Sequence, residues 1–414
     1  MTPTDVVDLL QAGKYDEIRD LFVPQLRSLV PADAIEAAWT AALTEHGALT
    51  DVGAPATEQG LTRIPLAFER GRQTLVMLMD GDGQLGSLQL APDTAAEPVV
   101  PWQQPSYVDT TAFDEEEVTL GSGALAVSGT LSVPRGAGPF PAVVLLSGSG
   151  AHDRDETIGR NKPFKDLAWG LACRGVAVLR FEKVTHAHPA EVTRERDFTV
   201  TDEYAPAALA AVELLRAHAA VDRIFLLGHS LGGTVAPRIA AAAGDIAGLV
   251  LLAAGAQPMH WAAVRQLRYL ASLGPAGVTE ATVEAMTRQA EAVDSPDLRP
   301  DTPDTELPFG VPAPYWLDLR GYDAPAAAAA LGVPVFAAQG GRDYQVTVAD
   351  DLARWRAALA DRPHVTVRVY EADNHLFFAG QGRPSPADYE PAQHLDPQVV
   401  ADVAEWVSAP VPPR

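Results

Sequence analysis

Hydrophobic residues in the first 90 positions change their spacing partway along. Over residues 6–22 and again over 35–43 they recur every three to four positions, which predicts amphipathic helices. After Gly53, apolar and polar residues alternate, as in strands with one buried face. The expected strands are residues 63–68, 73–79 and 85–90. Helices followed by antiparallel strands predict a small α+β domain.

A different rhythm begins near residue 117, where short apolar runs alternate with helical patterns. Such alternation predicts a mostly parallel sheet with crossover helices, an α/β fold. Residues 257–325 interrupt it with helical, proline-rich sequence and no expected strand, so we interpret them as a helical lid inserted over the sheet. The expected strands are residues 118–120, 125–133, 142–146, 176–181, 224–227, 248–252, 333–337 and 365–370.

Between the two patterns, residues 92–105 contain four prolines and no apolar period, which is typical of a linker. The sequence therefore predicts two domains, residues 1–97 and residues 98–414. A dimer through the first domain is one role that we consider for it.

Composition narrows the classes of function. The 414 residues carry 54 acidic against 31 basic side chains, a formal charge of −23, without the clustered Lys and Arg that nucleic-acid binding needs. The N-terminus has no signal-peptide pattern, and the apolar run 246–256 is shorter than the roughly 20 residues of a membrane span. We expect a cytoplasmic protein. A lone Cys173 and no metal-ligand spacing imply no disulfide, cofactor or metal.

One motif points to catalysis: Gly228-His229-Ser230-Leu231-Gly232, between an apolar strand and a helix. A nucleophilic serine needs its hydroxyl exposed on a sharp strand-to-helix turn, and glycines on both sides permit the close backbone approach. It is the only Gly-x-Ser-x-Gly in the chain. We predict Ser230 as the nucleophile.

A serine nucleophile needs a base and an orienting carboxylate, which follow it in the chain in this type of fold. His375 and Asp343 each follow an expected parallel strand, so both lie on the rim that carries Ser230. His394 stays open as a second candidate base, and Asp373 as a second candidate acid.

The oxyanion of the transition state needs two backbone N–H donors. The residue after the nucleophile, Leu231, supplies one. Ser147-Gly148-Ser149-Gly150, after the strand 142–146, supplies the other, with Ser149 preferred and Gly150 next.

Taken together, Gly-His-Ser-Leu-Gly-Gly, Gly340-Gly341-Arg342-Asp343 and Asn374-His375 resemble the α/β-hydrolase superfamily. The run Asp153-Arg154-Asp155-Glu156 after the glycine-rich loop is similar to bacterial two-domain carboxylesterases, in which a nuclear-transport-factor-2-like domain precedes the hydrolase. The resemblance implies a serine esterase whose triad is Ser230, Asp343 and His375. This chain has Phe181-Glu182-Lys183-Val184 where those enzymes carry a Tyr-Asp-Lys-Arg-like run, so no substrate preference is carried over.

The sequence thus predicts a serine carboxylesterase that hydrolyses a small-molecule substrate, a small or medium acyl ester, through an acyl-enzyme. An acyltransferase, cyclase or thioesterase with the same triad stays open, as does an N-terminal binding module with vestigial catalysis. Three of the four lysines, Lys162, Lys165 and Lys183, fall in one stretch, and either a substrate mouth or an ion-pair network explains them. Candidates for an acyl pocket, which lid packing explains equally well, are Met259, Trp261, Leu267, Tyr269, Phe309, Tyr315 and Trp316.

Overall fold

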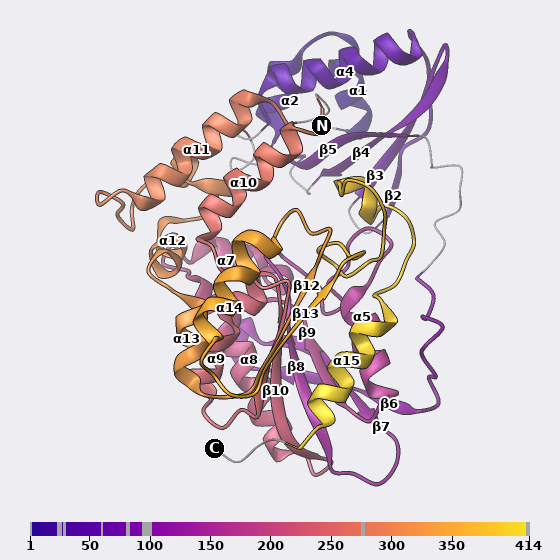
Figure 1. Cartoon of the computed structure of the whole chain (residues 1–414). Coiled ribbons are helices and arrows are strands. Elements are labelled where there is room, and N and C mark those ends of the chain that lie inside the picture. Colours follow the sequence, from indigo (N-terminus) through magenta and orange to yellow (C-terminus); the bar gives the residue numbers. More distant parts are fainter. Residues whose placement is uncertain are drawn as a thin grey trace. The chain divides into compact units, whose positions relative to one another are not determined.

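The computed structural model of the chain (Figure 1) describes residues 2–22, 27, 30–58, 61–79, 83–92, 102–274 and 278–410. The chain divides into two compact units: Met1–Val100 with Leu267–Ala313, and Pro101–Gln266 with Pro314–Arg414. Residues 93–101 of the expected linker lie outside the described residues, so the boundary at 97–98 stays a prediction. Residues 257–325 are shared between the units, and their role as a lid also stays a prediction.

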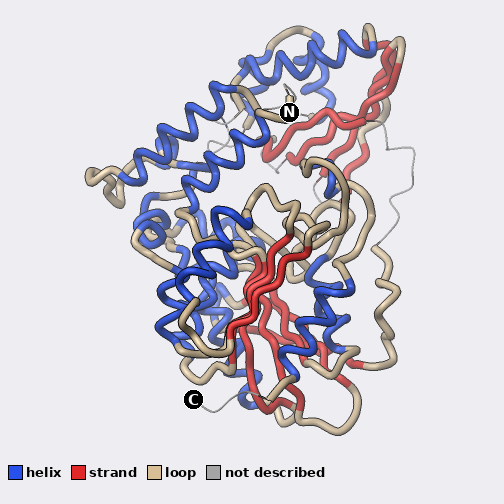
Figure 2. Tube along the Cα trace, viewed as in Figure 1, coloured by secondary structure: helices blue, strands red, loops and turns tan. Residues whose placement is uncertain are grey.

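The first unit carries helices and then a sheet, as the change of spacing predicts (Figure 2). The sheet is antiparallel in the order β1-β3-β4-β5, with β2 paired to β3. Val6, Ile18 and Trp39 from the helices pack with Ile64 and Leu75 from the sheet into one core. The elements are α1 Pro3–Gln11, α2 Tyr15–Leu21, α4 Ala32–His46, β1 Leu49–Val52, β2 Ala56–Glu58, β3 Leu61–Phe68, β4 Gly71–Met79, β5 Leu85–Pro92 and, from the later segment, α11 Glu280–Asp294.

The second unit is built on an eight-stranded sheet in the order β13-β12-β11-β10-β8-β9-β7-β6. Pairings β6–β7 and β7–β9 are antiparallel and the others are parallel, so the predicted mostly parallel sheet is confirmed. The strands are β6 Phe113–Leu120, β7 Val127–Pro134, β8 Phe140–Leu146, β9 Ala177–Phe181, β10 Val221–His229, β11 Gly248–Leu252, β12 Val335–Gly340 and β13 Val365–Tyr370.

Helices cover both faces of this sheet (Figures 1 and 2). Leu167 of α5 and Val403 of α15 pack with Val143 and Phe225 of the central strands in one apolar cluster, while α8 and α9 contact β8 and β10 from the other face. None of the described helices is long and apolar enough to cross a membrane. The helices are α5 Pro163–Ala172, α6 Val184–Ala187, α7 Pro189–Arg194, α8 Val200–Ala217, α9 Leu231–Ala243, α10 Met259–Ala271, which runs across the division between the units, α12 Ala313–Arg320, α13 Ala324–Leu331, α14 Ala353–Leu359 and α15 Pro397–Ser408.

Strand register brings the candidate site together. In the parallel pairs, Gly228 of β10 lies opposite Leu146 of β8, and Gly340 of β12 lies opposite Tyr370 of β13. Because the carboxyl ends of parallel strands meet at one edge, the loops after β8, β10, β12 and β13 all leave from that edge. These four loops carry every predicted member of the triad and of the oxyanion hole.

Candidate active site

Ser230 occupies the sharp turn between β10 and α9. Its backbone has φ 52° and ψ −120°, a conformation that L-residues with side chains rarely adopt, and its N–H donates to the Leu252 carbonyl at 2.9 Å. Strain of this kind persists only where the surroundings impose it, and it is common at active sites. The side chain is partly exposed. This is the geometry that a nucleophilic serine requires.

The turn requires glycine at positions 228 and 232, because a larger residue does not fit at either position. A Cβ on Gly228 would lie 2.3 Å from the Gly232 backbone, and a Cβ on Gly232 would lie 2.1 Å from the Leu146 carbonyl oxygen. Both clashes are with backbone, which cannot move aside as a flexible side chain can.

We expect Gly232→Ala to destabilise the protein by roughly 3 kcal/mol, as large steric conflicts in a core do. Gly321→Ala is the matched control, since a Cβ at Gly321 meets nothing within 4 Å, and it should change stability by less than about 0.5 kcal/mol. Urea denaturation of both variants measures the difference. Equal stability of the two variants would show that the elbow has room to adjust.

Asp343 and His375 form a buried pair. His375 Nδ1 lies 2.7 Å from Asp343 Oδ2, and the carboxylate also accepts hydrogen bonds from the Gln345 and Val346 N–H groups and from Gln339 Nε2. An ionised carboxylate only accepts hydrogen bonds, so His375 Nδ1 carries a proton and donates it to Asp343. This leaves His375 Nε2 as the nitrogen free to act as a base.

The structure does not join Ser230 to this pair by a hydrogen bond. Neither the Ser230 hydroxyl nor His375 Nε2 has a hydrogen-bond partner in the described part of the chain. The two residues are nevertheless neighbours, since the ring of His229, next to Ser230, lies 4.7 Å from the His375 ring. Catalytic hydrogen bonds are often long without substrate and tighten in the complex.

The rival candidates have other surroundings. His394 Nδ1 lies 3.1 Å from the buried Asp166 carboxylate, and burial raises the pKa of Asp166 to about 6. Asp373 is buried, and both of its carboxylate oxygens are unpaired among the described residues. Its burial, and to a smaller extent the negative charge of Asp396, raise its pKa to about 7. Neither contacts the His375 ring by a hydrogen bond.

The loop after β8 presents free backbone donors. The Gly148 N–H is occupied, donating to Glu156 Oε1 at 2.6 Å, and the Ser149 carbonyl accepts from His152 Nε2 at 2.7 Å. The N–H groups of Ser149, Gly150 and Leu231 donate to no group among the residues that the structure describes. A Cβ built on Gly148 would lie 3.3 Å from Ser230 Cβ, so this loop is adjacent to the nucleophile.

Two buried residues next to the site, Glu156 and His229, stand in the quoted motifs, but the sequence patterns gave them no role of their own. The buried Glu156, at φ 51°, accepts from His229 Nδ1 at 2.9 Å, and His229 Nε2 lies 3.0 Å from the His375 carbonyl oxygen. The Glu156 carboxylate and the His375 carbonyl can only accept hydrogen bonds. A protonated His229 ring donates to both of them, because both of its nitrogens then carry a hydrogen. Burial alone would lower the pKa of His229, but the Glu156 carboxylate raises it above the usual value. Burial would likewise raise the pKa of Glu156, yet charged His229 lowers it.

This pair makes stability depend on pH. The raised pKa of His229 contributes stability that is fully present below its unfolded pKa of about 6.5 and is lost as pH rises through the folded pKa. The lowered pKa of Glu156 contributes stability above about 4.5, which is lost as pH falls through its folded pKa. The contribution is therefore greatest between these values.

We expect His229→Gln to lower the free energy of unfolding by about 3–5 kcal/mol near pH 6, the usual effect of breaking a buried ion pair. The deficit should shrink as pH rises from about 6.5 to the folded pKa of His229, above which the native ring is neutral too. Urea denaturation of both proteins from pH 5 to pH 9 measures it. A deficit that is constant across this range would contradict a charged His229.

The residues predicted for an acyl pocket lie in different surroundings. Trp316 is fully buried and Tyr315 donates its hydroxyl to Glu203 at 2.6 Å, so core packing accounts for both. Phe309 is 39% exposed. Met259, Trp261, Leu267 and Tyr269 are partly exposed on α10, and their place in a pocket stays a prediction.

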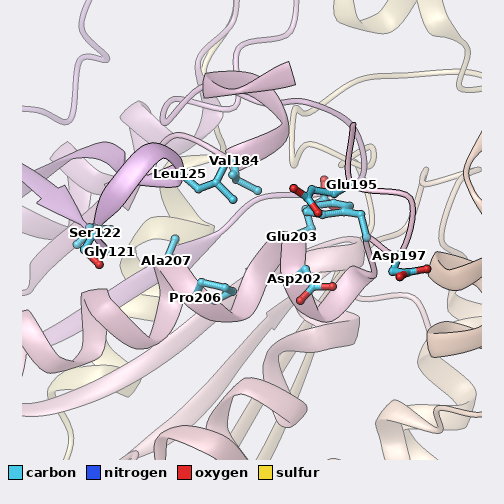
Figure 3. Close-up of a pocket in the computed structure, with 12 residues that line it drawn as sticks. Gly121, Ser122, Leu125, Val184, Glu195, Asp197, Asp202, Glu203, Pro206 and Ala207 are labelled. Atoms are coloured by element: carbon cyan, nitrogen blue, oxygen red, sulfur yellow. The ribbon is translucent and has the colours of Figure 1, made fainter. Parts of the chain in front are cut away.

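A cavity of about 540 Å³ in the second unit (Figure 3) is lined by other residues. Four of its side chains are acidic, and the rest are mainly apolar or small. The lining consists of Leu120, Gly121, Ser122, Leu125, Val184, Glu195, Asp197, Phe198, Asp202, Glu203, Pro206 and Ala207.

The three clustered lysines have separate surroundings. Lys162 pairs with Asp155 at 2.9 Å, which fits the ion-pair interpretation. Lys165 lies 4.7 Å from the rings of Trp102 and Trp169. Lys183 is only 2% exposed and pairs with Glu203 at 3.1 Å, so its ion pair is buried rather than part of a surface network.

Comparison with known proteins finds two matching protein families and one relative. Residues 4–88 match a family described as protein of unknown function (DUF3887), and residues 141–380 match the family described as serine aminopeptidase, S33. Esterase EstD from Thermotoga maritima is 36% identical over 350 residues, which cover 84% of this chain and 80% of the relative.

Solved structures include the esterase Pf2001 from Pyrococcus furiosus, 17% identical with a TM-score of 0.46 over 75% of this chain and 95% of that one. Est1E from Butyrivibrio proteoclasticus is 16% identical with a TM-score of 0.46, over 70% of this chain and 96% of its own. The match over residues 141–380 and the 36% identical relative confirm the expected fold: the chain belongs to the serine aminopeptidase S33 family of α/β-hydrolases.

Proposed function

We propose that the protein is a serine carboxylesterase in which Ser230, His375 and Asp343 form the triad. The observation that carries this is the buried Asp343–His375 hydrogen bond of 2.7 Å on the same sheet edge as the strained Ser230 turn. The 36% identity to an enzyme named as an esterase, over most of both chains, supports an ester as the substrate. Family membership by itself would leave the reaction open.

Acylation begins when Ser230 Oγ bonds to the ester carbonyl carbon and gives its proton to His375 Nε2. The carbonyl π pair moves to oxygen, and the N–H groups of Leu231 and Ser149 stabilise the resulting oxyanion. Each such donor is worth about 10²–10³ in rate. Collapse of the intermediate breaks the bond to the alkoxide, which takes the proton from His375 and leaves as the alcohol.

Deacylation repeats these steps with water. His375 Nε2 takes a proton from water while the water oxygen bonds to the acyl carbon, and the oxyanion forms again in the same hole. Its collapse breaks the bond to Ser230 Oγ, which recovers the proton from His375, and the carboxylic acid leaves. Asp343 holds the imidazole orientation and stabilises the imidazolium throughout.

The proposal is tested by treating the protein with a fluorophosphonate and locating the adduct by mass spectrometry, followed by turnover of p-nitrophenyl esters of increasing acyl length. We expect phosphonylation of Ser230 and release of free acid. Absence of the adduct in folded protein, or vestigial turnover of every ester, would contradict it. Product analysis with added alcohol or amine decides between hydrolysis and acyl transfer.

A dimer through residues 1–97 stays a prediction.

A further inference from the structure

The carbonyl groups of the loop after β8 are held from the buried side by residues that the proposed mechanism does not use. Tyr204 Oη, on α8, lies 2.9 Å from the Ser147 carbonyl oxygen and 2.8 Å from that of Gly148. Lys183 Nζ, just after β9, donates to the Gly148 carbonyl at 2.9 Å. The two carbonyls share the single Tyr204 hydroxyl hydrogen, and Lys183 adds a second donor at the Gly148 carbonyl.

This carbonyl shares its peptide plane with the proposed oxyanion donor. The Gly148 C=O and the Ser149 N–H belong to the same peptide group, and in a trans peptide they point in opposite directions. A carbonyl directed at the buried Lys183 therefore directs the Ser149 N–H the opposite way. The preceding peptide is held at both ends, by Tyr204 at the Ser147 carbonyl and by Glu156 at the Gly148 N–H.

Lys183 has the surroundings of a charged ammonium. Three oxygens lie around Nζ, namely the Gly148 carbonyl at 2.9 Å, Tyr204 Oη at 2.9 Å and Glu203 Oε1 at 3.1 Å, and they match its three N–H donors. Burial lowers the pKa of Lys183, and the Glu203 carboxylate opposes that shift. A cation on the carbonyl oxygen polarises the peptide and strengthens its N–H as a donor.

We propose that Lys183, assisted by Tyr204 and neutralised by Glu203, is a positioning residue that aims and polarises the Ser149 N–H toward the oxyanion. Lys183 touches no substrate atom in this role and acts only through the Gly148–Ser149 peptide. The inference rests on the proposed function, because it takes Ser149 as an oxyanion donor. It also gives a function to the one lysine of the sequence cluster that is fully buried.

Two sets of variants test it. Lys183→Met with Glu203→Gln removes both charges together, so that no buried charge is left unpaired. Tyr204→Phe removes one hydroxyl and retains the ring, which keeps the test decisive even where the double variant fails to fold. Lys14→Met is the matched control, because Lys14 belongs to the first unit and is half exposed, paired with Glu17 at 2.8 Å.

The readouts separate positioning from a general loss of structure. The number of active sites is titrated first, so that kcat refers to folded enzyme. KM is measured with a p-nitrophenyl ester, and affinity for the tetrahedral adduct with a trifluoromethyl ketone, whose carbonyl becomes an oxyanion when Ser230 adds to it.

In the double variant we expect kcat per active site to fall about 10- to 100-fold, less than complete loss of a donor. The inhibition constant of the ketone should rise by the same factor, while KM stays within about twofold. Tyr204→Phe should shift kcat and the inhibition constant together by a smaller factor, and Lys14→Met should shift neither.

Unchanged kcat and ketone affinity in Tyr204→Phe and in the folded double variant would overturn the inference. So would a loss of kcat without a loss of ketone affinity. Either result leaves the proposed esterase intact as long as Ser230→Ala is inactive. Turnover that persists in Ser230→Ala contradicts the proposed function itself, and the two failures are thereby distinguished.

Discussion

Ser230→Ala should lower kcat/KM for ester hydrolysis by about 10⁴- to 10⁶-fold, because the acyl-enzyme can no longer form. The rate that remains would come from the oxyanion donors and substrate binding alone. The fold should be unaffected, since the Ser230 hydroxyl makes no hydrogen bond within the described part of the chain and alanine retains the backbone of the turn.

Steady-state kinetics with a p-nitrophenyl ester measures this loss, and urea denaturation checks that stability is retained. Ser106→Ala is the matched control, since Ser106 is exposed in the turn before β6, and it should leave kcat/KM within about twofold. If Ser230→Ala kept full turnover, the nucleophile would lie elsewhere.

Asp343→Asn should lower kcat by about 10³- to 10⁴-fold. An amide in this place presents an N–H as well as a carbonyl and no longer fixes the Nδ1–H tautomer of His375, nor does it stabilise the imidazolium. KM should change little, since Asp343 is buried and does not face the substrate.

Asp373→Asn is the matched control for this substitution, because Asp373 is equally buried and lies two residues before His375. It should retain kcat within a few-fold of the original value. Because the pKa of Asp373 is raised from 3.8 to about 7, its replacement should stabilise the protein increasingly from about pH 4 and fully above about pH 7. Larger damage from Asp373→Asn than from Asp343→Asn would reassign the acid of the triad.

The fold was predictable because the change of hydrophobic spacing is strong. The alternation at residues 63–68 and 73–79 became β3 and β4, and the apolar runs at 142–146 and 224–227 became the centre of the parallel sheet. Parallel strands end at one edge, so residues that follow them could be grouped without knowing any contact.

The residues beneath the site could not be found in this way. Glu156 reaches His229 across 73 positions and depends on a backbone φ of 51°, which no local pattern announces in a run that looks like an acidic surface loop. Lysine is rare in this chain, which drew attention to Lys183. The burial of the Lys183 side chain beside Glu203, however, depends on how α8 packs against β8. Such features arise from tertiary packing rather than from spacing along the chain.

The central claim is that Ser230 carries the acyl group between two half-reactions. Rapid mixing with a p-nitrophenyl ester, acid quenching and mass mapping of the peptides test it most directly. The account predicts a burst of p-nitrophenol equal to the concentration of active sites and one acyl group on the peptide that contains Ser230. A burst with the acyl group on another residue, or turnover with no acylated peptide where deacylation limits the rate, would contradict it.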